Sequence, residues 1–186
     1  MKKISVYLTI SLVIISGIAG YMIGYSSTYE YRSSMYGRNL MDLGAADKWL
    51  DLRYVNAMIS HHRGAMLLAE QAQNSSRDDV RNIAKMILEN EPAAIEELYN
   101  WKEEWYGDTK EVKDPAKIQL GNVDEKFDLR FLNTLIAHHE NGVAMTEEVR
   151  MKSSRVEVLN NADAVEKFLK DGMVMLKEWR KNWYGI

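Results

Sequence analysis

An internal duplication constrains the fold of this 186-residue chain more than any other feature of its sequence. The hexapeptide Asp-Leu-Arg-Tyr-Val-Asn at 51–56 returns as Asp-Leu-Arg-Phe-Leu-Asn at 128–133, and the ending Trp-x-x-x-Trp-Tyr-Gly at 101–107 returns at 179–185. A His-His pair and a Ser-Ser-Arg tripeptide lie between these runs in both copies. Apolar residues recur at three- and four-residue spacing through each copy, which is typical of helices. We therefore predict two copies of one helical hairpin.

Each hairpin alone would expose an apolar stripe, so the two copies are predicted to pair into an all-α four-helix bundle. Residues 74–76 separate the first two helices, and residues 108–123 form the crossover between the copies. Pro92 lies inside the second helical pattern, where it lacks an amide hydrogen. We expect it to kink that helix or to divide it near Asn90.

The N-terminal segment has a different composition from the rest of the chain. Lys2 and Lys3 precede an uncharged run of 21 residues from Ile4 to Gly24. At about 1.5 Å per residue, such a helix matches a hydrocarbon core of about 30 Å. The predicted organisation has a membrane anchor or signal at 1–25, a tether at 26–45 and the bundle at 46–186, with repeats at about 51–107 and 128–185.

The charges beside the apolar run predict its orientation. Lysines before the run favour a cytoplasmic N-terminus, which places the bundle on the extracytoplasmic side, either periplasmic or at the cell surface. An uncleaved single-pass transmembrane helix fits the length of the run. A cleaved secretory signal is the alternative, because Gly17-Ile18-Ala19 resembles a cleavage site.

Composition excludes several classes of function. The formal charge of −3 gives no basic field for nucleic acid. The chain has no cysteine, so disulfides, thiolate nucleophiles and cysteine-based metal sites are absent. Histidine, methionine and carboxylate remain as metal ligands.

All four histidines lie in the two duplicated pairs. Met58 and Met66 stand four residues before and after His62, so one helical face presents Met-His-Met. Met145 stands seven residues after His138, two turns along the same face. Imidazole and thioether together suit Cu(I), and the predicted copper site comprises His61, His62, His138, His139, Met58, Met66 and Met145.

The pattern Met-Ile-x-His-His-x-Gly-Ala at 58–65, followed by a second apolar helix that ends in Trp, resembles the family known as domain of unknown function 305. The resemblance covers about residues 46 to 185. It implies an extracytoplasmic ferritin-like bundle, and some family members are implicated in copper binding or copper tolerance. The chain also departs from the family pattern. A methionine common six residues after the second histidine is Leu68 in the first copy and Met145 in the second, and the usual Gln and Glu of the second helix are Glu91 and Ala94, then Leu169 and Gly172.

The sequence lacks the motifs that an enzymatic interpretation would need. A ferritin-like di-iron site needs Glu-x-x-His pairs, but Met58 and Leu135 precede the histidines by three residues, and His-Glu-x-x-His is absent. We therefore expect no enzyme, but a membrane-anchored protein that sequesters or hands over copper. The alternative is a structural or interaction module of the envelope, in which the histidines form a core hydrogen-bond network. Besides the membrane, a second copy of the chain and a copper-handling protein are candidate partners.

Overall fold

The computed structural model of the protein describes residues 42–186, which form four α-helices and contain no strand. The helices are α2 (Leu50–Ala72), α3 (Asp78–Tyr106), α4 (Phe127–Lys152) and α5 (Val156–Tyr184). None of these four helices combines the length and the apolar character needed to cross a membrane. The predicted transmembrane run and most of the predicted tether lie outside the described residues.

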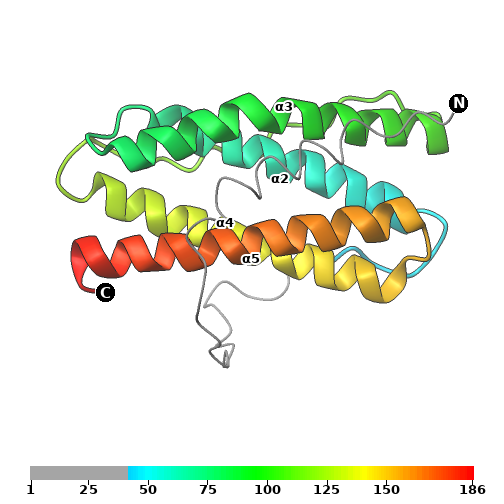
Figure 1. The fold of residues 1–186 in the computed structure, drawn as a ribbon. Coiled ribbons are helices and arrows are strands. Elements are labelled where there is room, and N and C mark those ends of the chain that lie inside the picture. The colour runs from blue at the N-terminus through cyan, green and yellow to red at the C-terminus, as the bar shows by residue number, and fades with distance from the viewer. Residues whose placement is uncertain (1–41) are drawn as a thin grey trace, which may run out of the picture. The chain divides into compact units, whose positions relative to one another are not determined.

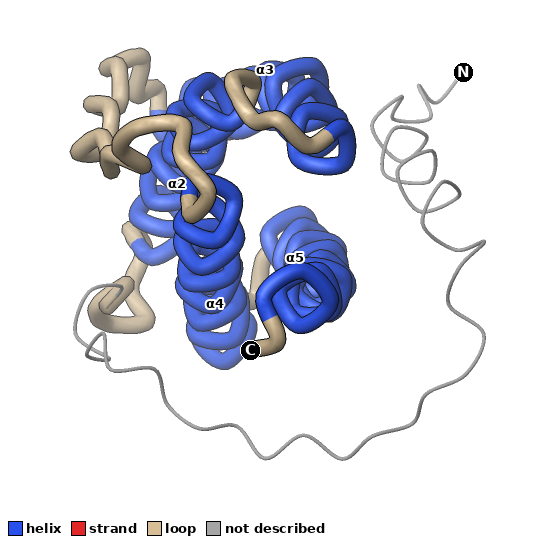
Figure 2. Tube along the Cα trace, turned by 90° about the vertical axis from the view of Figure 1, so that its left-hand side faces the viewer, coloured by secondary structure: helices blue, strands red, loops and turns tan. Residues whose placement is uncertain are grey.

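The four helices form the bundle that the duplication predicts, with each hairpin contributing two antiparallel helices (Figure 1). The segment between α3 and α4 returns along the length of the bundle, so α4 starts beside the end of α2 (Figure 1). The main packing is α2 on α3, α4 on α5, and α2 on α4. The end view in Figure 2 shows α2 beside α4 on one side of the bundle, with α3 next to α2 and α5 next to α4.

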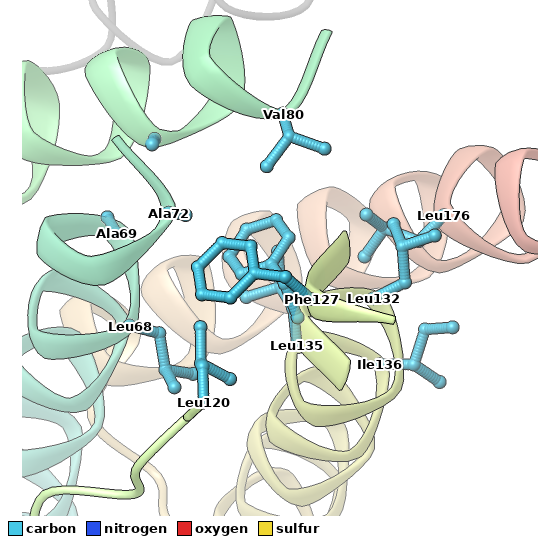
Figure 3. Packing of buried hydrophobic residues seen from close by; sticks show 12 residues of the cluster. Leu68, Ala69, Ala72, Val80, Leu120, Phe127, Leu132, Leu135, Ile136 and Leu176 are labelled. Carbon is cyan, nitrogen blue, oxygen red and sulfur yellow. The ribbon is translucent and has the colours of Figure 1, made fainter. Parts of the chain in front are cut away.

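The hydrophobic core is divided into two buried clusters, one toward each end of the bundle. The first includes Leu68 of α2 with Phe131 and Leu135 of α4, and Figure 3 shows part of it. The second includes Tyr54 and Met58 of α2 with further residues of all four helices. The histidine pairs fall between these clusters along both α2 and α4. The middle of the bundle is therefore its polar layer.

The duplicated motifs outside the histidines lock each end of the bundle across the two copies. Ser75 donates a hydrogen bond to Asp128 at 2.5 Å, and Arg77 pairs with the same carboxylate at 3.4 Å. At the opposite end, Asp51 of α2 accepts from Ser153 at 2.6 Å and pairs with Arg155 at 3.1 Å.

The terminal tryptophans extend both locks. The Arg77 guanidinium lies 4.4 Å from the centre of the Trp183 ring, and that of Arg155 lies 4.2 Å from the Trp105 ring, so each arginine stacks on the other copy. The repeated Asp, Ser-Ser-Arg and Trp residues thus serve the architecture.

Two details differ from the sequence prediction. Leu43 is buried in the second cluster, and its amide donates to the Glu148 side chain at 2.9 Å, so packing includes residues before the expected boundary at 46. Pro92 lies inside α3, so the expected division near Asn90 is wrong. The proline cannot donate to the Leu88 carbonyl four residues earlier, and the helix continues through this missing bond.

Candidate metal centre

The structure brings the two histidine pairs together at the centre of the bundle. The rings of His61 on α2 and His138 on α4 stack in parallel, with centroids 3.8 Å apart and planes 5° apart. His61 and His139 are both buried, each 7% exposed. One histidine from each duplicated pair therefore meets its counterpart across the two hairpins.

Glycines on neighbouring helices make room for two of the imidazoles. A β-carbon at Gly142 of α4 would lie 2.7 Å from Nε2 of His61, which is closer than real contacts allow. A β-carbon at Gly172 of α5 would lie 2.9 Å from Nε2 of His139. Each ring nitrogen therefore lies against helix backbone at a position where only glycine fits without a shift.

Burial keeps three of the histidines neutral near pH 7. Loss of solvation is the largest cause in each case, and it lowers the pKa of His138 from 6.5 to about 3 and that of His139 to about 4. The pKa of His61 falls well below its ordinary value for the same reason, and the neighbouring histidines lower it further. Neutral imidazoles retain a lone pair, which a metal ion requires.

Two of these nitrogens have no hydrogen-bond partner. Nε2 of His138 and Nδ1 of His139 are enclosed in the protein, and neither contacts a donor or an acceptor. A buried polar atom without a partner costs free energy, so its presence calls for an explanation such as a bound ion. This observation fits a soft metal ion better than it fits a completed hydrogen-bond network.

His62 has a different environment on the α2–α3 side. Its Nδ1 pairs closely with Oε2 of Glu91 on α3, and the two side chains are only 12% and 16% exposed. A carboxylate at Nδ1 favours the tautomer that leaves the Nε2 lone pair free.

The predicted methionine ligands have unequal positions. Met58 of α2 and Met145 of α4 are fully buried in the same hydrophobic cluster, next to the histidine layer. Met66 is half-buried and belongs to neither cluster. The structure thus gathers one thioether from each hairpin at the border of the polar layer.

The crossover segment covers one side of this layer. Arg63 holds it through the Val112 carbonyl and an ion pair with Asp114 at 3.1 Å. A β-carbon at Gly64 would lie 3.6 Å from the Pro115 ring and 3.4 Å from the His138 ring. The segment therefore lies against the helix surface that adjoins His138.

The histidine layer is not a ready-made cluster of nitrogen and oxygen ligands. Across residues 42–186, no three His, Asp or Glu side chains converge closely enough to hold a metal ion. A site in this layer would therefore also draw on other donors. Cu(I) selects imidazole and thioether donors, and the centre offers both.

The family model for the domain of unknown function DUF305 matches residues 51–126 and 128–185. This chain belongs to the DUF305 family. The two matched segments are the two helical hairpins, so the protein consists of a tandem pair of DUF305 units over those residues. No curated protein matches the sequence.

Solved structures share the fold of this tandem DUF305 bundle. CopM in its Cu(I)-bound form is 24% identical, and the match covers 74% of this chain and 99% of CopM with a TM-score of 0.64. CopM in an Ag-bound form, obtained by co-crystallization, is 23% identical over 72% of this chain and 97% of CopM, also with a TM-score of 0.64. CopM in its Cu(II)-bound form is 22% identical over the same shares with a TM-score of 0.62. At these identities the likeness establishes the shared four-helix fold.

Sequence reasoning missed three contributors to this centre. The histidine pattern gave no role to Gly142 or Gly172, because the need for glycine arises only where another helix brings an imidazole against the backbone. Glu91 was noted as a departure from the family pattern, but its pairing with His62 depends on how α3 packs on α2. The sequence signal that could have identified these residues is their position on the helix faces that contact the histidines.

Proposed function

We propose that this protein binds copper, in particular Cu(I), at the centre of the bundle, and that it sequesters the ion or hands it over without catalysing a reaction. The observation that carries the proposal is the pair of enclosed, unpartnered nitrogens on His138 and His139. The parallel stack of His61 on His138 places one imidazole from each hairpin side by side in this layer. CopM, which has the same fold, is known in Cu(I)-, Cu(II)- and Ag-bound forms.

In this proposal the histidines are the principal ligands, and methionine sulfur adds selectivity for Cu(I). Met58 and Met145 are the candidate thioether donors nearest the layer, and Met66 is a further candidate beside His62. The apolar run from Ile4 to Gly24 would anchor the bundle on the extracytoplasmic face of a membrane. That location would let the bundle capture copper outside the cytoplasm, with a copper-handling protein or a second copy of the chain as partner.

One observation favours a second candidate function. The His61–His138 stack also joins the two hairpins, as a structural module with a histidine core would require. The two functions differ in their response to metal. A ligand that binds only the folded state stabilises it by about 3 kcal/mol at 100 times its dissociation constant, whereas a purely structural stack gains nothing.

We therefore expect Cu(I) to raise the melting temperature of the full chain by several degrees. At this stabilisation and size, the shift should be about 5 to 10 °C. Thermal unfolding followed by circular dichroism under reducing conditions, with and without Cu(I), provides the measurement. Mg²⁺ serves as the control ion, because it prefers oxygen ligands. An unchanged melting temperature with Cu(I) would favour the structural module.

The thioether contribution can be separated from packing with Met58→Leu/Met145→Leu. Leucine keeps the volume of both buried side chains, so we expect metal-free stability to fall by less than about 3 kcal/mol for the pair. Loss of sulfur should weaken Cu(I) binding by about tenfold or more, equivalent to about 1.4 kcal/mol. Competition with a Cu(I) chelator measures the affinity, and the exposed Met151→Leu is the matched control. Equal affinity in the double variant and the parent would assign both methionines to packing alone.

A further inference from the structure

The second histidine of each pair has a different environment in the two copies. In the first copy, Nδ1 of His62 is paired with the Glu91 carboxylate. In the second copy, Nδ1 of His139 has no partner. The residue that corresponds to Glu91 there is Leu169, a buried core side chain. The duplication thus yields one imidazole with a carboxylate behind it and one without.

This difference has a direct consequence for metal binding. A carboxylate on one ring nitrogen orients the imidazole and makes the other nitrogen a stronger donor. Its negative charge also interacts twice as strongly with a dication as with a monocation at the same distance. Because His62 and Glu91 are mostly enclosed, salt screens this interaction less than it would on the surface.

Glu91 lies between the fully buried residues of α3. The fully buried residues of α3 are Val80 and Ala84 near its start and Leu98 and Lys102 near its end. Glu91 lies in the stretch between them, where α3 contributes no fully buried side chain. Its described polar contact is the one with His62.

We propose that Glu91 is a positioning residue that adjusts the preference of the centre between Cu(I) and Cu(II). By holding Nδ1 of His62 and adding a negative charge, it strengthens binding of Cu(II) more than binding of Cu(I). His139 has no carboxylate at Nδ1, so the second copy lacks this contribution. This inference rests on the proposed copper-binding function and adds a determinant of selectivity to it.

Three variants of the full chain test the role of Glu91. Glu91→Gln removes the charge but keeps an acceptor for His62, Glu91→Ala removes both, and Glu91→Asp keeps the charge. Glu96→Gln is the matched control, because Glu96 is an exposed carboxylate on the same helix. Affinities for Cu(II) and Cu(I) are measured by competition with chelators, and the metal-free fold of each variant is checked by circular dichroism.

Glu91→Gln is expected to weaken Cu(II) binding by about 10- to 100-fold, the usual cost of losing such a partner. Cu(I) binding should weaken by only about 3- to 10-fold, since the monovalent ion feels half the electrostatic free energy. The reduction potential of bound copper should rise by about 30 to 60 mV, at about 59 mV for each tenfold change in the ratio. Glu91→Ala should lose at least as much, while Glu91→Asp should keep part of the preference for Cu(II).

Equal losses for both oxidation states, or no loss for either, would overturn the role of Glu91. A parent protein that binds both ions while the variants behave like Glu96→Gln would remove this inference and leave the proposed function intact. A parent that binds neither ion would overturn both. Should a variant lose its helical spectrum without metal, Glu91 would be assigned to structure and the proposal would fail.

Discussion

Lowering the pH from 7 to 5 is expected to destabilise the metal-free protein by about 4 kcal/mol or more. His138 and His139 have folded-state pKa values of about 3 and about 4, below the ordinary value of 6.5. At pH 5 the unfolded chain takes up protons that the folded protein excludes. Each histidine then costs about 2 kcal/mol, from about 1.4 kcal/mol per pH unit below 6.5. The depressed pKa of His61 adds to the loss in the same direction.

The sign follows from which state binds the proton. These histidines contribute their full stability above pH 6.5, and the contribution falls as the pH drops toward their folded pKa values. Since domains are stable by only about 5–15 kcal/mol, this loss is a large fraction of the total. Between pH 5 and 6.5 most carboxylates remain ionised, so the histidines dominate this window.

Denaturant unfolding at pH 7 and pH 5, with a chelator present to remove metal, measures this effect. The variant His61→Gln/His138→Gln/His139→Gln is the control, because it lacks the groups that titrate and should lose most of the pH dependence. A parent protein whose free energy of unfolding changes by less than about 1 kcal/mol over this range would show that the histidines are not held neutral by burial.

The sequence predicted the architecture well because duplication and helical periodicity are local signals. The repeated Trp-x-x-x-Trp-Tyr-Gly endings mark the ends of α3 and α5, and Gly107 and Gly185 adopt the left-handed conformation that ends a helix. Pro92 shows the limit of such signals, since α3 continues through this internal proline.

The centre could be predicted only in part, because its details depend on contacts between helices. The duplication identified His61 and His138 as equivalent candidate ligands, but it could not show that their rings would stack. The same limit applies to Gly142, whose role requires His61 from another helix. The predicted inequality of the copies concerned methionines, whereas the structure adds an inequality between Glu91 and Leu169.

Removal of all four imidazoles is expected to abolish tight copper binding while the bundle remains folded. The two hydrophobic clusters and the locks at both ends of the bundle involve no histidine, so they persist in such a variant. Glutamine at His61, His62, His138 and His139 keeps a polar side chain of similar size but removes the nitrogen donors. The expected loss in Cu(I) affinity is about 100-fold or more, equivalent to about 3 kcal/mol.

Competition of the parent and the four-glutamine variant with a Cu(I) chelator tests the central claim most directly. Both proteins are titrated as the full chain under reducing conditions, and circular dichroism confirms that each is helical. The parent is predicted to withdraw Cu(I) from the chelator, while the variant leaves the ion with the chelator. Equal affinity in the two proteins would contradict the assignment of the histidine layer as a copper site.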